Sequence, residues 1–233
     1  MTDAPEAEIR KAEAEMLRTI AASFTRYADA TGIAALSPRV ARALEAVPRH
    51  LFVPDADWRA AYRDAPAPIG YGQTISQPFI VALMTELLRL GPGDTVLEIG
   101  TGCGYQTAVL AHLARRVFTI EIVAPLAERA REMFARLGLD NIVTRVGDGR
   151  AGWPEAAPFD GILAAAAPQA VPPALVQQLK PGGRLVMPVG MRHQQLILVE
   201  MQSDQSTTTR AIIPVSFVPL TEDRQAPDRD ADD

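Results

Sequence analysis

A glycine-rich segment, Gly100 to Gly104, is the part of this sequence whose residue types and spacing most directly suggest chemistry. It lies between an apolar run typical of a β-strand and a helical pattern, which is where open α/β sheets bind ligands. Alternate glycines leave no Cβ atoms to keep a ligand away from the backbone. A dinucleotide-binding motif would need a third glycine where this chain has Tyr105. The spacing, with Glu98 two residues before the first glycine, therefore fits a nucleoside with a positively charged amino-acid arm better than a pyrophosphate.

Two further acidic residues follow the next two predicted strands. Glu121 ends the second strand, and Asp148 stands between two glycines after the third. The carboxyl ends of neighbouring parallel strands open onto one crevice, so these side chains are expected to face the same ligand. Glu121 is placed to accept both hydroxyls of a ribose, and Asp148 to accept an adenine amino group. Together with the glycine-rich segment they predict a site for S-adenosylmethionine.

The composition argues against several other classes of function. The 233 residues include 23 Lys and Arg against 28 Asp and Glu, a net charge of -5, so nucleic acid is not an expected partner. The apolar run Ile162–Ala167 is far shorter than the roughly 20 residues that cross a bilayer, so no membrane association is expected. His50, His112 and His193 are too dispersed to predict a metal site. The single cysteine, Cys103, and an acidic N-terminus without a signal pattern favour the reducing cytoplasm.

The first third of the chain is predicted to be mainly helical. Apolar residues recur at the helical period over residues 8–30, and Gly32 ends that helix. Ser37 directly precedes a proline and reads as the N-cap of a short helix. Two prolines and two glycines within residues 65–75 predict an exposed or ligand-facing loop. Ser76 then reads as the N-cap of another amphipathic helix.

After a turn at Gly91, strand-like runs alternate with helical patterns. Five β-type runs recur at intervals of roughly 20 to 25 residues: Thr95–Ile99, Val117–Ile120, Ile142–Val146, Ile162–Ala166 and Arg184–Pro188. The intervening helical patterns are Tyr105–Ala114 and Pro125–Leu137. This alternation builds βαβ units and predicts a parallel sheet with helices on both faces. Leu196–Met201 and Ala211–Val218 are joined by a linker too short for a crossover helix, so they are predicted to pair as a C-terminal antiparallel hairpin.

Six blocks of the sequence carry a resemblance to a known family. They are Val47–Pro54, Ile69–Pro78, the glycine-rich segment through Gln106, Val146–Gly149, Ala165–Pro168 and Leu179–Leu185. In content and order they resemble the protein-L-isoaspartate O-methyltransferase family. The glycine-rich segment and the Lys-Pro-Gly-Gly turn are shared with many methyltransferases, whereas Gly-Tyr-Gly-Gln-Thr-Ile-Ser-Gln-Pro is specific to this family. The resemblance covers Ser37 to Thr221, which is most of the chain.

The resemblance implies the α/β fold of the Rossmann-like class I S-adenosylmethionine-dependent methyltransferases. Such a fold has a doubly wound, mostly parallel sheet, here with a C-terminal antiparallel hairpin and an N-terminal helical extension. The expected divisions are the helical extension at residues 1–36, the methyltransferase domain at 37–222 and a disordered acidic tail at 223–233. No heptad pattern or long apolar edge is evident, so a monomer is expected.

The substrate that the resemblance implies is the free α-carboxylate of an L-isoaspartyl residue in damaged proteins and peptides. Methylation by S-adenosyl-L-methionine leaves S-adenosyl-L-homocysteine and a methyl ester, which collapses to a succinimide and lets normal aspartate re-form. A carboxylate with a pKa of about 4 is ionised at neutral pH, so the nucleophile needs no general base. Catalysis should therefore come from alignment of the reacting atoms in a site that excludes water.

Ser76 is the catalytic residue that the resemblance implies, and it would orient the substrate carboxylate rather than attack. Thr74, Gln77 and the backbone N–H groups of the helix that begins there are expected to assist. From the residues alone, a helix N-cap is the simpler interpretation of Ser76. The cofactor-binding residues implied are Thr74, Ile75, Glu98, Gly100, Thr101, Gly102, Gly104, Tyr105, Gln106, Glu121, Ile122, Asp148, Gly149 and Thr221.

Three other residues leave alternatives open. Arg49 and His50 either contact the substrate or anchor a packed loop. Cys103 stands where the family usually has a small hydroxyl residue. It either fills space in the loop or, if it lies near a helix N-terminus, forms a reactive thiolate.

Three rival functions follow from the same residues. A related methyltransferase could esterify ordinary aspartate in one dedicated peptide, and a generic isoaspartyl peptide would distinguish the two. A nicotinamide oxidoreductase would also place Glu121 on a ribose, although the missing third glycine argues against it. A non-catalytic binding module would keep the fold and lose the site, yet the cofactor-facing acids and Ser76 are all present.

Overall fold

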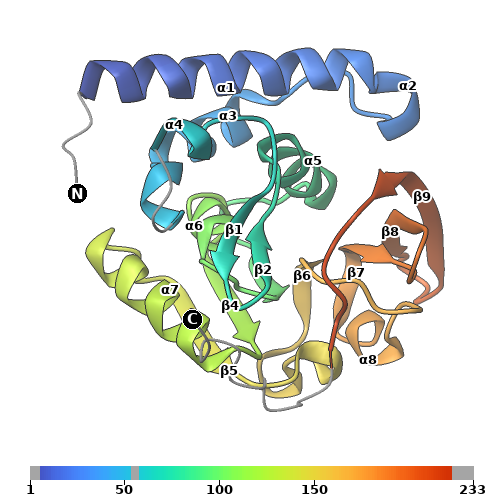
Figure 1. Cartoon of the computed structure of the whole chain (residues 1–233). Helices are drawn as coiled ribbons and strands as arrows, with labels where there is room; N and C mark the ends of the chain where they lie inside the picture. The colour runs from blue at the N-terminus through green and yellow to red at the C-terminus, as the bar shows by residue number, and fades with distance from the viewer. Residues whose placement is uncertain (1–5, 54–57, 222–233) are drawn as a thin grey trace.

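A computed structural model describes residues 6–53 and 58–221 of the chain, so the predicted tail at 223–233 lies outside the described residues. The predicted N-terminal helix is confirmed in two pieces, α1 (Glu6–Arg26) and α2 (Ala28–Thr31), with Gly32 ending the second at a φ of 72°. In Figure 1, α1 runs along one side of the molecule and packs on α5. No helix in the described part of the chain is long and apolar enough to cross a lipid bilayer.

The predicted cap at Ser37 is confirmed. Helix α3 (Pro38–Ala46) begins with a proline, and the Ser37 side chain accepts a hydrogen bond from the Val40 N–H at 3.2 Å. A 3₁₀ turn, η1 (Arg49–Phe52), and the short helix α4 (Trp58–Ala61) follow.

Residues 67–75 form a β-hairpin, so the predicted exposed or ligand-facing segment is not an irregular loop. Strand β1 (Ala67–Gly70) pairs antiparallel with β2 (Gln73–Ile75). Tyr71 and Gly72 make the two-residue turn at φ values of 54° and 67°, which matches the twist of paired strands. The prolines that suggested a loop are tolerated because this small sheet has only edge strands.

Ser76 does not cap the next helix, which corrects the N-cap interpretation. Helix α5 (Pro78–Leu88) has Gln77 at its N-cap position, and the Gln77 side chain makes no capping bond. The Asp64 carboxylate instead accepts a hydrogen bond from the Phe79 N–H at 2.9 Å. The Ser76 hydroxyl is therefore not used to start the helix.

The central sheet has seven strands in the order β5-β4-β3-β6-β7-β8-β9. Their bounds are β3 (Thr95–Ile99), β4 (Arg116–Glu121), β5 (Ile142–Val146), β6 (Phe159–Ala164), β7 (Leu179–Val189), β8 (Gln194–Met201) and β9 (Thr207–Val215). Strands β3 to β7 run parallel, and β8 and β9 add the antiparallel hairpin. This confirms the predicted doubly wound, mostly parallel sheet. The strand order reverses between β3 and β6, where such sheets open a crevice at their carboxyl ends.

Helices cover both faces of the sheet, as predicted, but unequally. On one face, α6 (Tyr105–Ala111) and α7 (Ala124–Arg136) share a core with α1, α3 and α5. On the other face, Trp153, Phe159 and Leu175 fill a second core under short turns, namely η2 (Gly149–Ala151), η3 (Pro154–Ala156) and α8 (Pro173–Val176).

Gly104 couples the glycine-rich segment to helix α7 and supplies a test of the packing. Its φ is +91°, and an added Cβ would lie 2.6 Å from a ring atom of Phe134. Gly138 is a matched control, because its φ is +67° and an added Cβ would meet no atom within 4 Å. We expect Gly138→Ala to lower the free energy of unfolding by about 1 kcal/mol through backbone strain. Gly104→Ala should lower it by about 2–5 kcal/mol, because overpacking is added. Equal losses in urea unfolding would contradict this packing.

Candidate functional site

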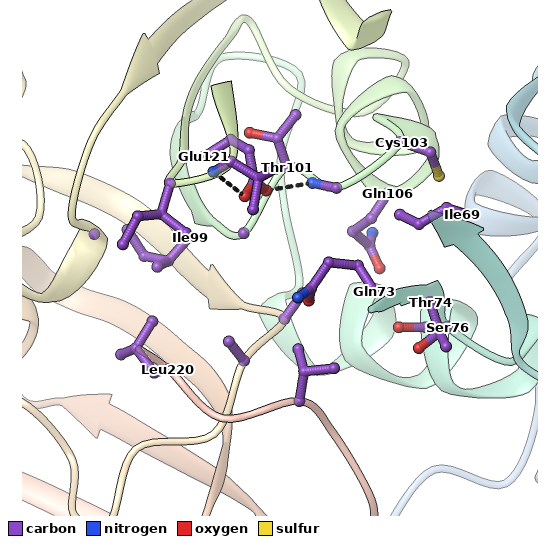
Figure 2. Close-up of a pocket in the computed structure, with 18 of the residues that line it drawn as sticks. Ile69, Gln73, Thr74, Ser76, Ile99, Thr101, Cys103, Gln106, Glu121 and Leu220 are labelled. Atoms are coloured by element: carbon purple, nitrogen blue, oxygen red, sulfur yellow. Dashed lines mark hydrogen bonds between the residues drawn. The ribbon is translucent and has the colours of Figure 1, made fainter. Parts of the chain in front are cut away.

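A cavity lies over the carboxyl ends of β3, β4, β5 and β6, at the predicted crevice (Figure 2). Its volume is about 880 Å³ when its open mouth is included. The glycine-rich segment after β3, Glu121 at the end of β4 and Ala165 after β6 line its inner side. The β1–β2 hairpin and residues 218–221 also line the cavity.

Glu121 is the one charged side chain among the described residues that line this cavity. Its side chain is buried, and its two oxygens accept hydrogen bonds from the backbone N–H groups of Gly102 at 2.7 Å and Val123 at 2.9 Å. These bonds fix the orientation of the carboxylate. A carboxylate has about four acceptor positions, so Glu121 keeps acceptor capacity for two further donors such as a pair of ribose hydroxyls.

The backbone itself forms the floor of the cavity. Gly100 and Gly102 have φ values of 87° and 54°, a region that side chains disfavour. Gly149, at the adjacent strand end, has no room for a side chain, because a Cβ would lie 2.3 Å from a methyl group of Ile99. Contact between a ligand and the peptide groups of these glycines stays a prediction.

Glu98 lies beneath the glycine-rich segment and does not line the cavity. It is fully buried, and Thr107 and Thr119 both donate their hydroxyls to its Oε2. Burial raises the pKa of Glu98 to about 8, so the side chain holds a proton at neutral pH. Thr119 also shares a 2.6 Å hydrogen bond with Thr101, so this buried network supports the segment from below.

Asp148 also lies outside the set of lining residues, although its neighbours Gly147 and Gly149 belong to it. Its carboxylate forms an ion pair with the Arg150 side chain at 2.7 Å and accepts a hydrogen bond from the Arg150 backbone N–H at 2.9 Å. The hydrogen bonds from Arg150 lower the pKa of Asp148. Contact between Asp148 and an adenine amino group stays a prediction.

The structure brings together most of the predicted site residues. Those that line the cavity are Thr74, Ile75, Ser76, Gly100, Thr101, Gly102, Tyr105, Gln106, Glu121, Ile122, Gly149 and Thr221. Glu98, Gly104 and Asp148 do not line it. The sequence reasoning missed Ile69, Gln73, Val81, Ile99, Cys103, Ile120, Val123, Gly147, Ala165, Ala166, Val218, Pro219 and Leu220. The strand-end rule that found Glu121 would also have found Ala165, which follows β6. The prediction of an exposed or ligand-facing segment at residues 65–75 includes Ile69 and Gln73 but did not single them out.

A second cavity adjoins the first and shares Thr74, Ser76, Ala165 and Val218 with it. Its volume is about 930 Å³ with the open mouth included. The hydroxyls of Thr74 and Ser76 lie at the edge of the first cavity in Figure 2, beside Gln73. Ser76 therefore stands where the two cavities meet.

Residues 217–220, which contribute Val218 to both cavities, are held in place by hydrogen bonds of their backbone. Val218 accepts a hydrogen bond from the Ala167 N–H at 2.8 Å, and the Leu220 N–H donates to the Ala167 carbonyl at 2.9 Å. At the preceding residue, Phe217, the buried Gln194 side chain donates to the backbone carbonyl at 2.9 Å and accepts from the backbone N–H at 2.6 Å. These contacts hold residues 217–220 against the sheet.

Three residues that the sequence left open are now placed. Cys103 is half-buried, and desolvation raises the pKa of its thiol to about 11, which favours the space-filling interpretation over a reactive thiolate. Arg49 is fully buried, and neither it nor His50 lines either cavity. The His50 Nδ1 lies 2.8 Å from the Tyr62 hydroxyl. Arg49 and His50 are thus anchors of a packed turn.

The raised pKa of Glu98 makes a testable contribution to stability. The folded protein binds this proton more tightly than the unfolded chain, whose pKa is near 4.5, so the free energy of unfolding should fall as the pH rises from about 4.5 to about 8. Each unit of pKa shift corresponds to about 1.4 kcal/mol, so the fall should reach a few kcal/mol. Glu98→Gln removes the titrating group. Urea unfolding across this pH range should show a smaller fall for the variant, and equal slopes would contradict the assignment.

Comparison with known proteins identifies the family. The model of the Protein-L-isoaspartate(D-aspartate) O-methyltransferase family matches residues 25–225. Protein-L-isoaspartate O-methyltransferase 2 of Syntrophobacter fumaroxidans is 54% identical over 212 residues, which cover 90% of this chain and 86% of that protein. Protein-L-isoaspartate O-methyltransferase 1 of Nitrosospira multiformis is 60% identical over 183 residues, 78% of each chain.

Solved structures agree with this result. A protein-L-isoaspartate O-methyltransferase superposes with a TM-score of 0.76 at 27% identity, covering 88% of this chain and 66% of that one. A putative protein-L-isoaspartate O-methyltransferase from Plasmodium falciparum, solved with S-adenosyl-L-homocysteine, has the same fold at a TM-score of 0.73 and 23% identity, over 88% of this chain and 98% of that one. The chain therefore belongs to the protein-L-isoaspartate(D-aspartate) O-methyltransferase family.

Proposed function

We propose that the first cavity holds S-adenosyl-L-methionine, that the second admits the isoaspartyl residue, and that Ser76 orients the substrate carboxylate where the two meet. As a family member, the chain is a methyltransferase that esterifies the free α-carboxylate of L-isoaspartyl residues in proteins and peptides. The ester then collapses to a succinimide, which starts repair. The observation that carries the assignment of roles is that Ser76 lines both cavities.

The first cavity fits the cofactor that the family uses. The backbone of Gly100 and Gly102, whose N–H groups are bonded to Ile120 and Glu121, would lie against its amino-acid arm, and the Glu121 carboxylate would accept the ribose hydroxyls. The negative charge of Glu121 also suits a ligand with positive groups. S-adenosyl-L-methionine supplies an electrophilic methyl group on its sulfonium, and S-adenosyl-L-homocysteine is left.

The protein's own contribution is orientation and exclusion of water. The substrate carboxylate is ionised at neutral pH, so no base is required. Ser76 and Thr74 offer hydroxyl donors at the boundary of the cavities, and apolar walls from Ile80, Ala165 and Phe217 surround the second cavity. Donors fixed before the substrate arrives hold the nucleophilic oxygen in line at little cost in reorganisation.

The proposed specificity is tested directly with matched peptides. Wild-type protein, labelled S-adenosyl-L-methionine and a pair of peptides that differ only in isoaspartyl against aspartyl linkage should give label in the isoaspartyl peptide alone. Label in neither peptide, or in the aspartyl peptide, would favour an enzyme dedicated to another substrate. The family relationship does not favour that alternative.

Other aspects of the function stay predictions from the sequence. These are a monomer that works in the cytoplasm without nucleic acid or membrane as a partner, and a methyltransferase domain at residues 37–222. The acidic balance of the chain, with a net charge of -5, supports the prediction about nucleic acid.

Glu121→Ala tests the cofactor cavity. Losing a charged acceptor of two hydroxyl donors should weaken binding of S-adenosyl-L-methionine by about 2–3 kcal/mol in calorimetry. Asp148→Ala is the comparison, and it should cost less because Arg150 already engages that carboxylate. Unchanged affinity in both variants would contradict the placement of the cofactor.

Ser76→Ala tests the orienting role. Loss of one hydrogen bond made in the transition state should lower turnover about ten- to a thousandfold, with little change in affinity for S-adenosyl-L-methionine. Because Ser76 caps no helix, the free energy of unfolding should change by no more than about 0.5 kcal/mol.

Two companion substitutions sharpen that test. Ser76→Thr keeps the hydroxyl and should retain more activity than Ser76→Gly, which removes it. Wild-type turnover in Ser76→Gly would show that the hydroxyl is not used. A covalent adduct trapped on Ser76 would show that it attacks rather than orients.

A further inference from the structure

Arg49 is a buried cation directly behind the segment that carries Ser76. Its side chain has no exposed surface. Its Nε donates to the Ala61 carbonyl and one of its Nη groups donates to the Ser76 carbonyl, both at 2.7 Å. The guanidinium also stacks on Tyr105, 4.7 Å from the ring centroid, and Tyr105 lines the first cavity. Arg49, which lies in η1, thus links the Ser76 segment to α4 and, through Tyr105, to the first cavity.

No carboxylate in the described part of the chain forms an ion pair with Arg49. Asp64 acts on it electrostatically, but the Asp64 oxygens accept from the Gln77 side chain and the Phe79 N–H, both at 2.9 Å. The other Nη group of Arg49 has no hydrogen-bond partner of normal geometry, and the Tyr105 hydroxyl interacts with the guanidinium. A buried cation that carbonyls and an aromatic ring hold, with no carboxylate paired to it, is costly, which points to a use beyond packing.

The geometry of the peptide bond shows what that use is. The bond between Ser76 and Gln77 is trans, so its C=O and N–H point in opposite directions. The C=O is turned to the buried Arg49, so the Gln77 N–H points away from Arg49. Ser76 and Gln77 both line the second cavity. A charged donor on the carbonyl draws electrons from the amide and strengthens the N–H as a donor.

We infer that Arg49 is a positioning residue that fixes the Ser76–Gln77 peptide and polarises the Gln77 N–H as a donor to the substrate carboxylate. This inference rests on the proposed function, because it needs an isoaspartyl carboxylate in the second cavity. Arg49 itself does not touch the substrate. Its charge stays behind the peptide, where water does not screen it.

Charge, hydrogen bonding and packing are separated by three variants. Arg49→Gln removes the charge and keeps a polar group, whereas Arg49→Lys keeps the charge and places its donors on a single nitrogen. The matched control is Arg39→Gln, because Arg39 is a half-buried arginine that also bridges two backbone carbonyls, those of Leu90 and Leu113, and it lines neither cavity.

The readout is the affinity of the isoaspartyl peptide for protein saturated with S-adenosyl-L-homocysteine, together with the thermal midpoint and kcat/KM. For Arg49→Gln we expect peptide affinity and kcat/KM to fall about 10- to 100-fold, as for loss of a charged hydrogen bond, with affinity for S-adenosyl-L-homocysteine within about threefold. Arg49→Lys should recover to within about threefold of wild type. Arg39→Gln should lower the thermal midpoint and leave both peptide readouts unchanged.

Several results would overturn the inference. They are wild-type peptide affinity in Arg49→Gln, equal losses in the Lys and Gln variants, or the same loss in Arg39→Gln. If Arg49→Gln does not fold, amide hydrogen exchange on the wild type decides, since the Gln77 N–H should become protected when the peptide binds and unchanged exchange would refute the role. Failure of the wild type to methylate the peptide would instead count against the proposed function.

Discussion

The rest of the site depends on fixing the position of the short segment that carries Ser76, where the two cavities meet. Ser76 stands between two cavities, so few side chains are available to pack around it. The segment is held from behind instead, by Arg49 on the Ser76 carbonyl and by Asp64 on the Phe79 N–H and the Gln77 side chain. Preorganisation of this kind is what a methyl transfer needs when its nucleophile is already ionised.

The proposed cofactor cavity is lined by few charged groups of the described chain. Glu121 is the charged group that lines the first cavity among the described residues. Burial keeps Glu98, which lies beneath the glycine-rich segment, protonated at neutral pH, and Cys103 in the cavity wall is a neutral thiol. Glu121 is oriented by the N–H groups of Gly102 and Val123, one from the segment after β3 and one from the turn after β4. The fold thus places one carboxylate and several peptide groups at adjoining strand ends, where we propose that the cofactor binds.

Patterns of neighbouring residues in the sequence predicted those features of the fold and site that depend on neighbouring residues. The alternation of strands and helices predicted the sheet, and residues at strand ends such as Gly100 and Glu121 lie where that rule placed them. Spacing limited the rule for caps: Ser37, directly before a proline, caps α3, whereas Ser76, two residues before one, does not cap α5. The contacts that Arg49 and Asp64 make with Ser76, Gln77 and Phe79 join residues 13 to 27 positions apart, and no local pattern predicts them.

The most direct test of the account is a crystal structure of the protein with S-adenosyl-L-homocysteine and an isoaspartyl peptide. The account predicts the ribose hydroxyls on Glu121, the peptide in the second cavity, and the substrate carboxylate within about 3 Å of the Ser76 hydroxyl and the Gln77 N–H. A substrate carboxylate bound away from the boundary between the cavities, or a ribose that does not contact Glu121, would contradict it.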